Sequence, residues 1–523
     1  MTDLAPAPQL IPAPDRLEPT GLPVTLTTSS TLAAGDGLAT PAARLREALG
    51  LPLPESGDTR DGHTTDGDPA VSLELDDALP PEGYRLVVDG SSQPSVRISG
   101  GDPAGVFYGV QTLRQLMEPG RLAMADMPVD LPGVQIEDAP AFGWRGLMVD
   151  VGRHFMPVDE LHTVLDWMAL HKLNTLHLHL TEDQGWRFEV KSWPRLTEIG
   201  SQRSESVVGH AARSTTYDGI PHGGFYTQEE LRALVEFAAG RFIRIVPEVD
   251  LPGHTQAARA AYPELGYDEA EHQVMTTWGV SDHIMRVDER GLDFAKDVIG
   301  ELIEVFPSPF IHIGGDEAPK REWEASDIAR RQLAELGLSD MDSLQSWFTG
   351  QLAEFIESRG RRLVGWDEIL EGGDLPPEVV VMSWRGMEPG LEAARLGLDV
   401  VMASTSHTYF DYQQGDPTVE PLSIGGQLTL ETVWDFEPTP AELTVEEARH
   451  IIGVQAQIWR EYMPDLRTVE RMAFPRLAAL ADIAWQHGDR GDFADFRDRL
   501  AHHLTRLAAL GVTYRPLDQP AQS

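Results

Sequence analysis

The chain has 523 residues, a formal net charge of −41 and no cysteine. It is too long for one ordinary domain, so we expect two domains, one of them large. The negative charge disfavours nucleic acid and a membrane surface as partners, and the lack of cysteine excludes disulfides, thiolate metal sites and a cysteine nucleophile.

The amino-terminal end offers no targeting or membrane signal. Residues 1–20 are rich in Pro and Ala, which is typical of a loosely packed segment. They contain neither a basic stretch nor a continuous apolar run, so they do not resemble a signal peptide. Nothing further along approaches the ~20 apolar residues of a membrane span. We expect a cytoplasmic protein, while export by a route without such a peptide is compatible with the sequence.

Strand and helix patterns follow one another within residues 1–138. Residues 53–70 are polar and contain glycine, so they are expected to form a loop. The apolar alternation in 84–90 and 95–100 predicts two strands, and the spacing in 102–117 predicts a helix. We predict a small α+β domain over 1–138. Because it carries no cluster of catalytic residue types, its expected role is to support its neighbour.

From residue 139 onward, apolar runs alternate with amphipathic segments. The runs are typical of buried parallel strands, and the segments between them are typical of helices. One helix is marked by a capping box formed by Thr227 and Glu230. The runs begin at Gly143, Asn174, Phe242, Pro309, Arg361, Glu378, Leu398 and Ile452. These eight units predict an α/β fold, a (β/α)8 TIM barrel over 139–523, with its active site at the carboxyl ends of the strands.

Each predicted strand is followed by polar or aromatic side chains, which should therefore meet at one rim of the barrel. In chain order they are Asp150 and Arg153, Asp183, Asp250 and His254, Asp316 and Glu317, Trp366 and Asp367, Trp384, Tyr409 and Asp411, and Trp459 and Glu461. Ordinary loop solvation would account for some of them. The set as a whole indicates a functional site.

The 12 tryptophans all lie at or after Trp144. Trp366, Trp384 and Trp459 each end an apolar run, and carboxylates stand close to the first and the third. This combination suits a sugar, because the C–H faces of a pyranose stack on indole and its hydroxyls bond to carboxylates and Arg. A single Trp is often simply part of the core. The repetition at strand ends favours a carbohydrate pocket.

The motif HIGGDEAPK, residues 312–320, places Asp316 beside Glu317. In an extended strand the two side chains would point to opposite faces, but Gly314 and Gly315 let the backbone leave strand geometry and approach a ligand. Two carboxyl groups held close raise the pKa of one of them. We expect a neutral Glu317 that acts as a general acid beside an anionic Asp316. The alternative is an acidic helix start with no catalytic role.

Long strings in this order resemble one known family. They are GWRGLMVDVGRHF from Gly143, NTLHLHLTEDQGWR from Asn174, PEVDLPGHTQAA from Pro247, HIGGDEAPK, VGWDEIL from Val364, MSWRG from Met382, YFDYQ from Tyr409 and GVQAQIWREY from Gly453. The family is glycoside hydrolase family 20, the β-N-acetylhexosaminidases. The small amino-terminal domain also resembles the usual companion of that catalytic domain.

The resemblance implies removal of terminal non-reducing β-linked N-acetylglucosamine or N-acetylgalactosamine, for example from chitooligosaccharides, by a retaining, substrate-assisted mechanism without a cofactor or metal. It implies that Glu317 is the general acid and base, that Asp316 orients the acetamido group and that Tyr409 binds its carbonyl oxygen. The other implied substrate-binding residues are Arg153, Asp411 and Glu461 on the hydroxyls, Trp366, Trp384 and Trp459 around the ring, and Asp183 and His254 in a network that tunes Glu317. The preferred sugar epimer and the oligomeric state are left open.

Two residues depart from the pattern of the family. Glu182 and Arg460 stand where a smaller or shorter residue is expected, and Arg460 could alter the preference at the sugar O4 or O6.

Three alternatives remain at this stage. His177 and His179 lie on one face of a predicted strand, as in metal-dependent amidohydrolases. A glycan-binding protein with an inactive site is the second alternative. The third is a glycosidase in which Asp316 itself is the nucleophile.

Overall fold

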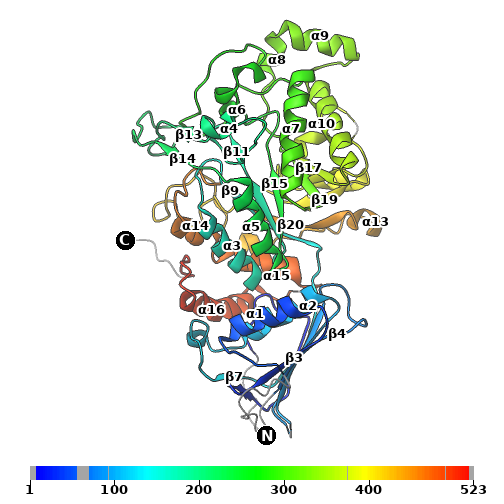
Figure 1. The fold of residues 1–523 in the computed structure, drawn as a ribbon, viewed down its shortest axis with the longest axis vertical. Helices are drawn as coiled ribbons and strands as arrows, with labels where there is room; N and C mark the ends of the chain where they lie inside the picture. The colour runs from blue at the N-terminus through cyan, green and yellow to red at the C-terminus, as the bar shows by residue number, and fades with distance from the viewer. Residues whose placement is uncertain (1–7, 56–69, 92, 374, 489, 518–523) are drawn as a thin grey trace.

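The computed structural model describes residues 8–55, 70–91, 93–373, 375–488 and 490–517. Over these ranges a small α+β unit is followed by a closed barrel, and Figure 1 shows the two stacked along the long axis of the molecule. Most of the predicted loop 53–70 lies outside the described residues. The fold class expected from the sequence is confirmed.

The small unit is built on a six-stranded sheet covered by two helices. The strand order is β1 (Arg16–Pro19), β8 (Val134–Asp138), β5 (Tyr84–Asp89), β6 (Ser95–Gly100), β4 (Ala70–Leu75) and β3 (Thr31–Ala34), with α1 (Ala39–Leu49) and α2 (Pro103–Gln115) packed on it and β2 (Val24–Leu26) paired with β7 (Val129–Leu131). Buried residues alternate along β5, and the Asp102 carboxylate caps α2 by accepting from Gly105 N. The two strands and the helix predicted here are confirmed.

The expectation of a loosely packed amino-terminal segment is wrong for its described part. Leu10 and Ile11 are only 2% and 0% exposed. Ile11 N donates to Gln115 Oε1 at 3.0 Å, and Ala13 N donates to Asp482 Oδ1 at 2.7 Å. Two apolar residues within a Pro-rich context are thus enough to anchor the segment, which composition alone does not indicate.

The barrel consists of eight parallel strands, and every predicted run forms one of them. In order around the barrel they are β9 (Trp144–Asp150), β10 (Thr175–His179), β15 (Arg244–Glu248), β16 (Phe310–His312), β17 (Arg362–Trp366), β18 (Val380–Ser383), β19 (Asp399–Met402) and β20 (Ile451–Ile458). The barrel closes where β20 pairs in parallel with β9. Because all strands run the same way, their carboxyl ends form one rim.

Helices and short elements surround this barrel. The longer helices are α3 (Val158–Leu170), α5 (Gln228–Ala239), α7 (Glu289–Val305), α9 (Asp327–Leu336), α10 (Met341–Ser358), α11 (Glu388–Arg395), α14 (Leu466–Ala473), α15 (Arg476–Trp485) and α16 (Phe493–Ala509). The shorter elements are β11 (Thr181–Glu182), β12 (Gly185–Trp186), α4 (Arg195–Glu198), β13 (Gln202–Arg203), β14 (His222–Gly223), α6 (Gln256–Ala261), η2 (Pro263–Leu265), α8 (Arg321–Ala325), η3 (Asp367–Leu370), α12 (Leu430–Trp434) and α13 (Val445–Ala448), while η1 (Pro119–Arg121) belongs to the small unit. The predicted capping box of Thr227 and Glu230 starts α5.

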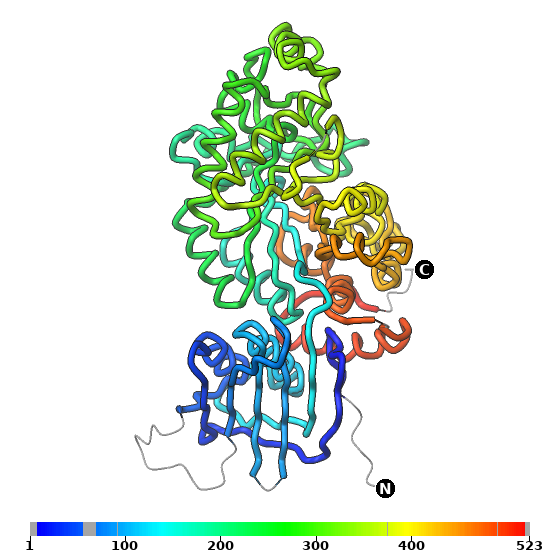
Figure 2. Tube along the Cα trace, turned by 90° about the vertical axis from the view of Figure 1, so that its right-hand side faces the viewer, coloured from blue at the N-terminus to red at the C-terminus, as the bar shows by residue number. Residues whose placement is uncertain are grey.

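The small unit packs against the end of the barrel where the strands begin. Arg145, near the start of β9, forms an ion pair with Glu82 at 2.8 Å. Lys172, just before β10, pairs with Asp138 at 2.9 Å, and Trp485 Nε1 donates to the same carboxylate at 2.9 Å. Figure 2 shows the sheet of the small unit at one end of the molecule, with the carboxy-terminal helices lying next to it. The strand ends that carry the candidate site face away from this contact.

Asp138 is a point at which the stability of this contact can be tested. It is 4% exposed, Lys172 is 1% exposed, and Tyr84 donates to the same carboxylate at 2.6 Å. Asp138→Asn leaves the buried ammonium of Lys172 without its anion, so we expect the free energy of unfolding to fall by about 3–5 kcal/mol in urea denaturation. Glu446→Gln, which breaks an exposed pair with Arg449, should change it by less than about 1 kcal/mol. Equal effects of the two variants would contradict this assignment.

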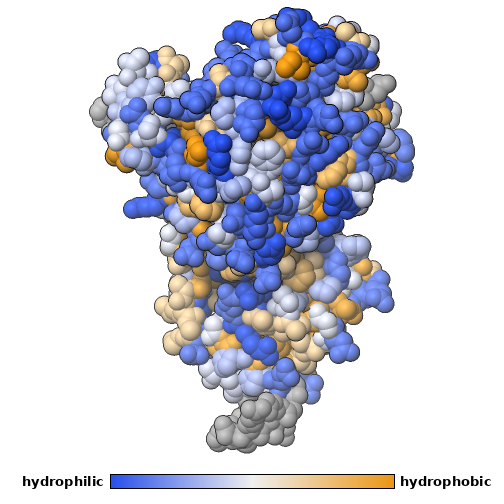
Figure 3. Space-filling model, turned by 45° about the horizontal axis from the view of Figure 1, so that its top comes forward, coloured by the Kyte–Doolittle hydropathy of each residue, from blue (hydrophilic) through white to orange (hydrophobic). Residues whose placement is uncertain are grey.

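The face of the molecule shown in Figure 3 is mainly hydrophilic, with apolar residues scattered over it. This distribution agrees with the high negative charge of the chain. Among the described residues, no helix combines the length and the apolar character needed to cross a bilayer.

Candidate active site

A pocket opens at the carboxyl ends of the barrel strands. All the residues that the family resemblance assigns to the site, except Asp183, line it, namely Arg153, His254, Asp316, Glu317, Trp366, Trp384, Tyr409, Asp411, Trp459 and Glu461. Of the wider set expected at the rim, Asp150, Asp250 and Asp367 do not line the pocket. The lining residues come from different strand ends along the whole barrel. The structure therefore brings together side chains that lie between Arg153 and Glu461 in the sequence.

The glycine pair of the HIGGDEAPK motif determines how the two acidic residues reach the pocket. Strand β16 ends at His312, and Gly314 and Gly315 have φ angles of +70° and +99°, in the region that favours glycine. A Cβ atom on Gly314 would collide with the Asp250 carboxylate, which accepts a hydrogen bond from Gly315 N at 3.2 Å. The chain leaves the strand here, as the sequence predicts.

Asp316 and Glu317 lie on the same side of the pocket but differ in exposure. Asp316 is 7% exposed, whereas the side chain of Glu317 is 41% exposed, at the mouth of the pocket. His254 Nε2 stands 3.7 Å from Asp316 Oδ2 and 3.5 Å from Glu317 Oε2. Glu317 also has a positive φ of 44°, which is costly for a residue with a side chain and is typical of functional positions.

The pair has the opposite protonation preference from the one expected. Burial, reinforced by Glu317, raises the pKa of Asp316 to about 6. A hydrogen bond from His254 lowers the pKa of Glu317 below its usual range. Burial opposes a charge on His254, but its acidic neighbours, first among them Glu182, outweigh burial and raise its pKa well above the ordinary value. The expectation of a neutral Glu317 is therefore wrong for the free site, because an imidazolium faces this carboxylate.

Aromatic rings form the wall around the two carboxylates. Trp366 is 1% exposed and donates from Nε1 to Glu248 Oε1 at 2.9 Å. Trp384 donates from Nε1 to Glu368 Oε2 at 2.8 Å, and its ring stacks on Tyr409 at 6.2 Å between centroids. These hydrogen bonds fix the rings, so the wall is preformed for the apolar parts of a ligand.

At the other side of the pocket, charged side chains lie close together, but some of their polar atoms have no hydrogen-bond partner. Arg153 lies 3.5 Å from Glu461 and over the ring of Trp459, 5.0 Å from its centroid. Within the described part of the chain, Asp316 Oδ1, Asp411 Oδ1 and Glu461 Oε2 have no hydrogen-bond partner. Buried acceptors without donors are costly, and the hydroxyl and amide groups of a sugar would supply the missing donors. Burial, together with Glu461, raises the pKa of Asp411 well above its usual range.

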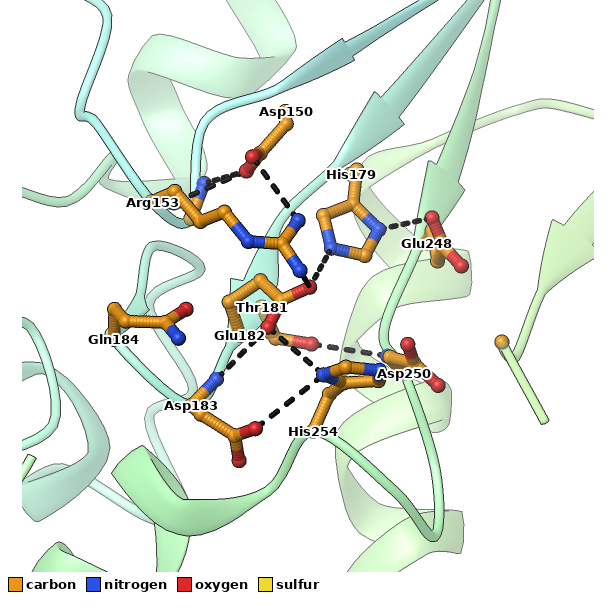
Figure 4. A network of polar contacts seen from close by, with 12 residues as sticks. Asp150, Arg153, His179, Thr181, Glu182, Asp183, Gln184, Glu248, Asp250 and His254 are labelled. Carbon is orange, nitrogen blue, oxygen red and sulfur yellow. Dashed lines mark hydrogen bonds and ion pairs between the residues drawn. The ribbon is translucent and has the colours of Figure 1, made fainter. Parts of the chain in front are cut away.

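Asp183 lies behind the pocket. Its carboxylate accepts hydrogen bonds from Gln256 N at 2.9 Å and Ser281 N at 3.1 Å. It stands 3.4 Å from His254 Nδ1. Figure 4 shows Asp183 and Glu182 next to His254. Asp183 thus holds the start of α6 and the loop at Ser281 near His254 and does not line the pocket.

Arg460 does not line the pocket either. It is fully buried, and its guanidinium donates to the carbonyl oxygens of His154 at 2.8 Å and Met463 at 3.2 Å. The expected influence of Arg460 on the sugar O4 or O6 is therefore wrong, because this side chain is outside the pocket and its Nε and Nη1 donate to backbone carbonyls elsewhere.

The pocket also contains residues that the sequence did not assign to it. They are Glu182, Gly279, Val280, Thr405, Tyr412 and Ile424. Glu182 and Tyr412 are chain neighbours of predicted residues, so they could have been found as flanking positions of the matched strings. Val280 belongs to a segment without regular structure between α6 and α7, and no pattern in the sequence indicated it.

The paired histidines of β10 do not form a substrate-accessible centre. His177 and His179 are fully buried, and both contact Glu248. Neither lines the pocket, and Trp366 donates to the same Glu248 from the pocket side. A metal ion held by these imidazoles would not meet a substrate in the pocket, which argues against the amidohydrolase alternative.

Known proteins match this chain over both parts of the fold. Residues 142–488 match the glycosyl hydrolase family 20 catalytic domain, and residues 7–139 match glycosyl hydrolase family 20, domain 2. A beta-hexosaminidase of Porphyromonas gingivalis is 43% identical over 463 residues, which cover 87% of this chain and 58% of that protein. A beta-N-acetylhexosaminidase of Cellulomonas fimi is 34% identical over 522 residues, which cover 98% of this chain and 96% of that protein.

Solved structures give the same result. The GH20 beta-N-acetylhexosaminidase from Streptomyces coelicolor is 31% identical with a TM-score of 0.83, covering 98% of this chain and 99% of that one. The GH20 exo beta-N-acetylglucosaminidase from Vibrio harveyi was solved in complex with N-acetylglucosamine. It is 30% identical with a TM-score of 0.84, and the match covers 99% of this chain and 79% of that one. The chain therefore belongs to glycosyl hydrolase family 20 and is a glycosidase of the β-N-acetylhexosaminidase type.

Proposed function

We propose that the enzyme removes terminal non-reducing β-linked N-acetylglucosamine or N-acetylgalactosamine from oligosaccharides or glycoconjugates, including chitooligosaccharides, by a retaining mechanism in which the substrate supplies the nucleophile. One observation carries this proposal. Asp316 and Glu317 both face His254 Nε2, at 3.7 and 3.5 Å, so they stand on one side of the pocket. A retaining enzyme with its own nucleophile instead places its two carboxyl groups on either side of the scissile bond.

In the first step, the carbonyl oxygen of the 2-acetamido group attacks the anomeric carbon. Glu317 protonates the glycosidic oxygen as its bond to that carbon breaks, and the aglycone leaves with this proton. The product is an oxazolinium ring whose positive charge lies partly on nitrogen. The anion of Asp316 stabilises this charge and holds the N–H, while Tyr409 donates to the carbonyl oxygen.

In the second step, Glu317 is the base. It removes a proton from a water molecule that attacks the anomeric carbon, the C–O bond to the acetamido oxygen breaks, and the acetamide is restored. Two displacements at the same carbon leave the configuration unchanged. The exposure of Glu317 at the pocket mouth supports this role, because the aglycone and the water must both reach it from solvent.

The remaining pocket residues bind the sugar. Arg153, Asp411 and Glu461 bind the hydroxyls at the non-reducing end, where Asp411 Oδ1 and Glu461 Oε2 lack donors and Arg153 Nε lacks an acceptor. Trp366, Trp384 and Trp459 surround the ring and the acetamido methyl group. This division gives an exo-acting pocket, since the hydroxyl-binding side is closed by buried charged residues.

The proton for the first step is stored on His254 in the free site. The imidazolium faces Glu317 at 3.5 Å, and its pKa is raised well above the ordinary value, whereas that of Glu317 is lowered. A bound sugar expels water from Glu317, and loss of water raises the pKa of a carboxyl group. Binding therefore favours transfer of this proton to Glu317, without a net change in the charge of the site.

The pKa of Asp316 predicts the acid limb of the pH profile. Asp316 must be ionised to stabilise the oxazolinium, and its pKa in the free protein is raised to about 6. With a neutral substrate, kcat/KM reports groups of the free enzyme. It should therefore be about half its maximum near pH 6, level off about one pH unit higher and fall about tenfold per pH unit well below pH 6. An acid limb near pH 4, the ordinary range of an aspartate, would contradict this assignment.

An inhibitor that resembles the intermediate tests the mechanism directly. A thiazoline fused to the sugar at C1 and C2 mimics the cyclised intermediate, so we expect competitive inhibition at concentrations at least about 100-fold below KM. An enzyme that uses Asp316 as its nucleophile forms no such ring. Failure of the thiazoline to inhibit at concentrations well above KM would exclude the acetamido mechanism.

A further inference from the structure

A second cavity lies at the junction between the small unit and the barrel, at the opposite end of the barrel from the active-site pocket. Helices α1 and α2 of the small unit, α3 and α14 of the barrel and the end of α16 contribute to its walls (Figure 1). Its volume is about 300 Å³, within the range of about 300–1,000 Å³ that small-molecule sites span, and such sites are frequent at domain interfaces. It shares no lining residue with the active-site pocket.

Arg114, on α2, is a cation of this cavity without a counter-ion. Among the described residues, none forms a hydrogen bond or an ion pair with its guanidinium. The acids that act on it are Asp166 and Glu47, and each is already paired. Asp166 lies 2.6 Å from Arg241 Nε, and Glu47 lies 2.6 Å from Arg44 Nη1. Both acidic side chains are also more than half exposed, so solvent weakens their effect on Arg114.

Burial of this arginine is therefore only partly compensated. It lowers the pKa of Arg114 below the ordinary value, and the two acids offset only a part of this change. An arginine nevertheless keeps its proton at neutral pH. The folded chain thus holds a partly buried positive charge that no described side chain neutralises.

Two further side chains of the cavity have polar atoms without a partner. Gln111 on α2 and Trp167 on α3 are each 4% exposed, and Gln111 Oε1 and Trp167 Nε1 form no hydrogen bond within the described part of the chain. Buried polar groups are normally paired, because an unpaired one is costly. Water can bond to these neutral groups, but it does not neutralise Arg114.

The remaining wall is largely apolar. Its buried apolar residues include Phe107, Leu170, Leu507 and Val512. Glu470, the third acid of the cavity, accepts a hydrogen bond from Thr513 N at 2.9 Å and is not among the charges that act on Arg114. An apolar wall with one free cation and a few polar groups is typical of a site for a small organic anion.

We propose that this cavity binds a small organic acid, with its carboxylate on Arg114 and an aromatic or branched apolar body against the wall. Arg114 belongs to the small unit and Trp167 to the barrel, so such a ligand contacts both units and stabilises their association. The small unit then contributes a ligand site in addition to supporting the barrel. The inference does not depend on the function proposed for the other pocket.

The test uses 4-fluorobenzoate as the probe, because it combines a carboxylate with a compact ring. Its binding to the full chain is followed by 19F NMR without substrate, and we expect saturable binding with a Kd of about 1 mM or below. Two analogues divide the probe into its parts. 4-Fluorobenzamide keeps the ring without the charge, and acetate keeps the charge without the ring. Each should bind at least about 10-fold more weakly.

Three variants place the binding in the cavity. Arg114→Met removes the charge and keeps a long side chain, so Kd should rise at least about 10-fold. Its Tm without ligand should not fall, because the exchange removes a charge that is unpaired in the folded chain. Ala48→Leu adds methyl groups to the cavity wall and should also weaken binding while Arg114 stays in place. Arg449→Met, an exposed arginine paired with Glu446 outside the cavity, is the control and should keep the wild-type Kd.

Several outcomes would overturn the inference. A cavity that holds water only would give no saturable binding at about 10 mM probe. Equal affinity for 4-fluorobenzamide, a wild-type Kd in Arg114→Met or in Ala48→Leu, or a marked loss of Tm in Arg114→Met would also contradict it. A Kd that rises when N-acetylglucosamine is added would place the probe in the active-site pocket instead.

The test remains decisive if one variant is lost. If Arg114→Met does not fold, Ala48→Leu and the two analogues still decide the question with folded protein. Because binding is measured without substrate, it can fail while the wild-type enzyme cleaves N-acetylhexosaminides. Failure of this inference is therefore distinct from failure of the proposed function.

Discussion

Replacing Glu317 with Gln should lower kcat by about 10²–10⁴-fold, the usual contribution of general acid–base catalysis. Gln has nearly the same shape as Glu but can neither give a proton to the glycosidic oxygen nor take one from water. The side chain is 41% exposed at the pocket mouth, away from the hydroxyl-binding residues, so KM should change little. The loss therefore belongs to the transition state and not to substrate binding.

The leaving group distinguishes the two roles of Glu317. An aglycone that departs readily as an anion, such as dinitrophenolate, needs no acid, so the first step should be largely preserved in Glu317→Gln. Its second step still lacks a base, and azide, an anion that needs no deprotonation, should partly restore turnover and give a β-glycosyl azide. Glu446→Gln is a suitable control, because this exposed carboxylate pairs with Arg449 away from the pocket, and it should retain wild-type kcat. An unchanged kcat in Glu317→Gln would remove Glu317 from its proposed role.

The barrel and most of the pocket could be predicted because they follow from local patterns. Buried parallel strands produce continuous apolar runs. Because the strands run in a common direction, residues at their carboxyl ends, such as Trp366 and Asp411, can be assigned to one rim before any contact is known. The glycine pair before Asp316 likewise predicts a departure from strand geometry, and Gly314 and Gly315 do have positive φ angles.

The direction of individual side chains at the rim could not be predicted in this way. Asp183 follows the short strand Thr181–Glu182 in a turn. Glu182 lines the pocket and Asp183 does not, although Asp183 stands 3.4 Å from His254 Nδ1, as the resemblance implied, whereas Glu182 stood out in the sequence only as a departure from the family. Arg460, between the pocket residues Trp459 and Glu461, also lies outside the pocket.

The proton assignment of the acidic pair also required the tertiary structure. Two adjacent carboxyl groups predict that one pKa is raised, and this is so, but for Asp316 and not for Glu317. The difference comes from burial, which raises the pKa of Asp316, and from a hydrogen bond with His254, which lowers the pKa of Glu317. His254 belongs to a distant part of the sequence and approaches Glu317 only in the folded barrel. No local pattern contains this contact.

The largest expected effect concerns the substrate itself. If the acetamido oxygen is the nucleophile, a β-glucoside or β-galactoside without this group lacks the attacking atom. An attacking group within the same molecule is worth an effective concentration of about 10⁵–10⁸ M, and the carboxylates on the other side of the pocket, Asp411 and Glu461, are assigned to the sugar hydroxyls and not to the anomeric carbon. We therefore expect kcat/KM for the plain sugars to be at least about 10⁴-fold lower.

This prediction can be checked with one set of 4-nitrophenyl substrates that share a leaving group. The set contains the β-N-acetylglucosaminide, the β-N-acetylgalactosaminide and the corresponding β-glucoside and β-galactoside, and kcat/KM is measured for each. The account predicts rapid release from one or both N-acetyl sugars and almost none from the plain sugars. Comparable rates for an N-acetyl sugar and its plain counterpart would contradict a mechanism in which the substrate provides its own nucleophile.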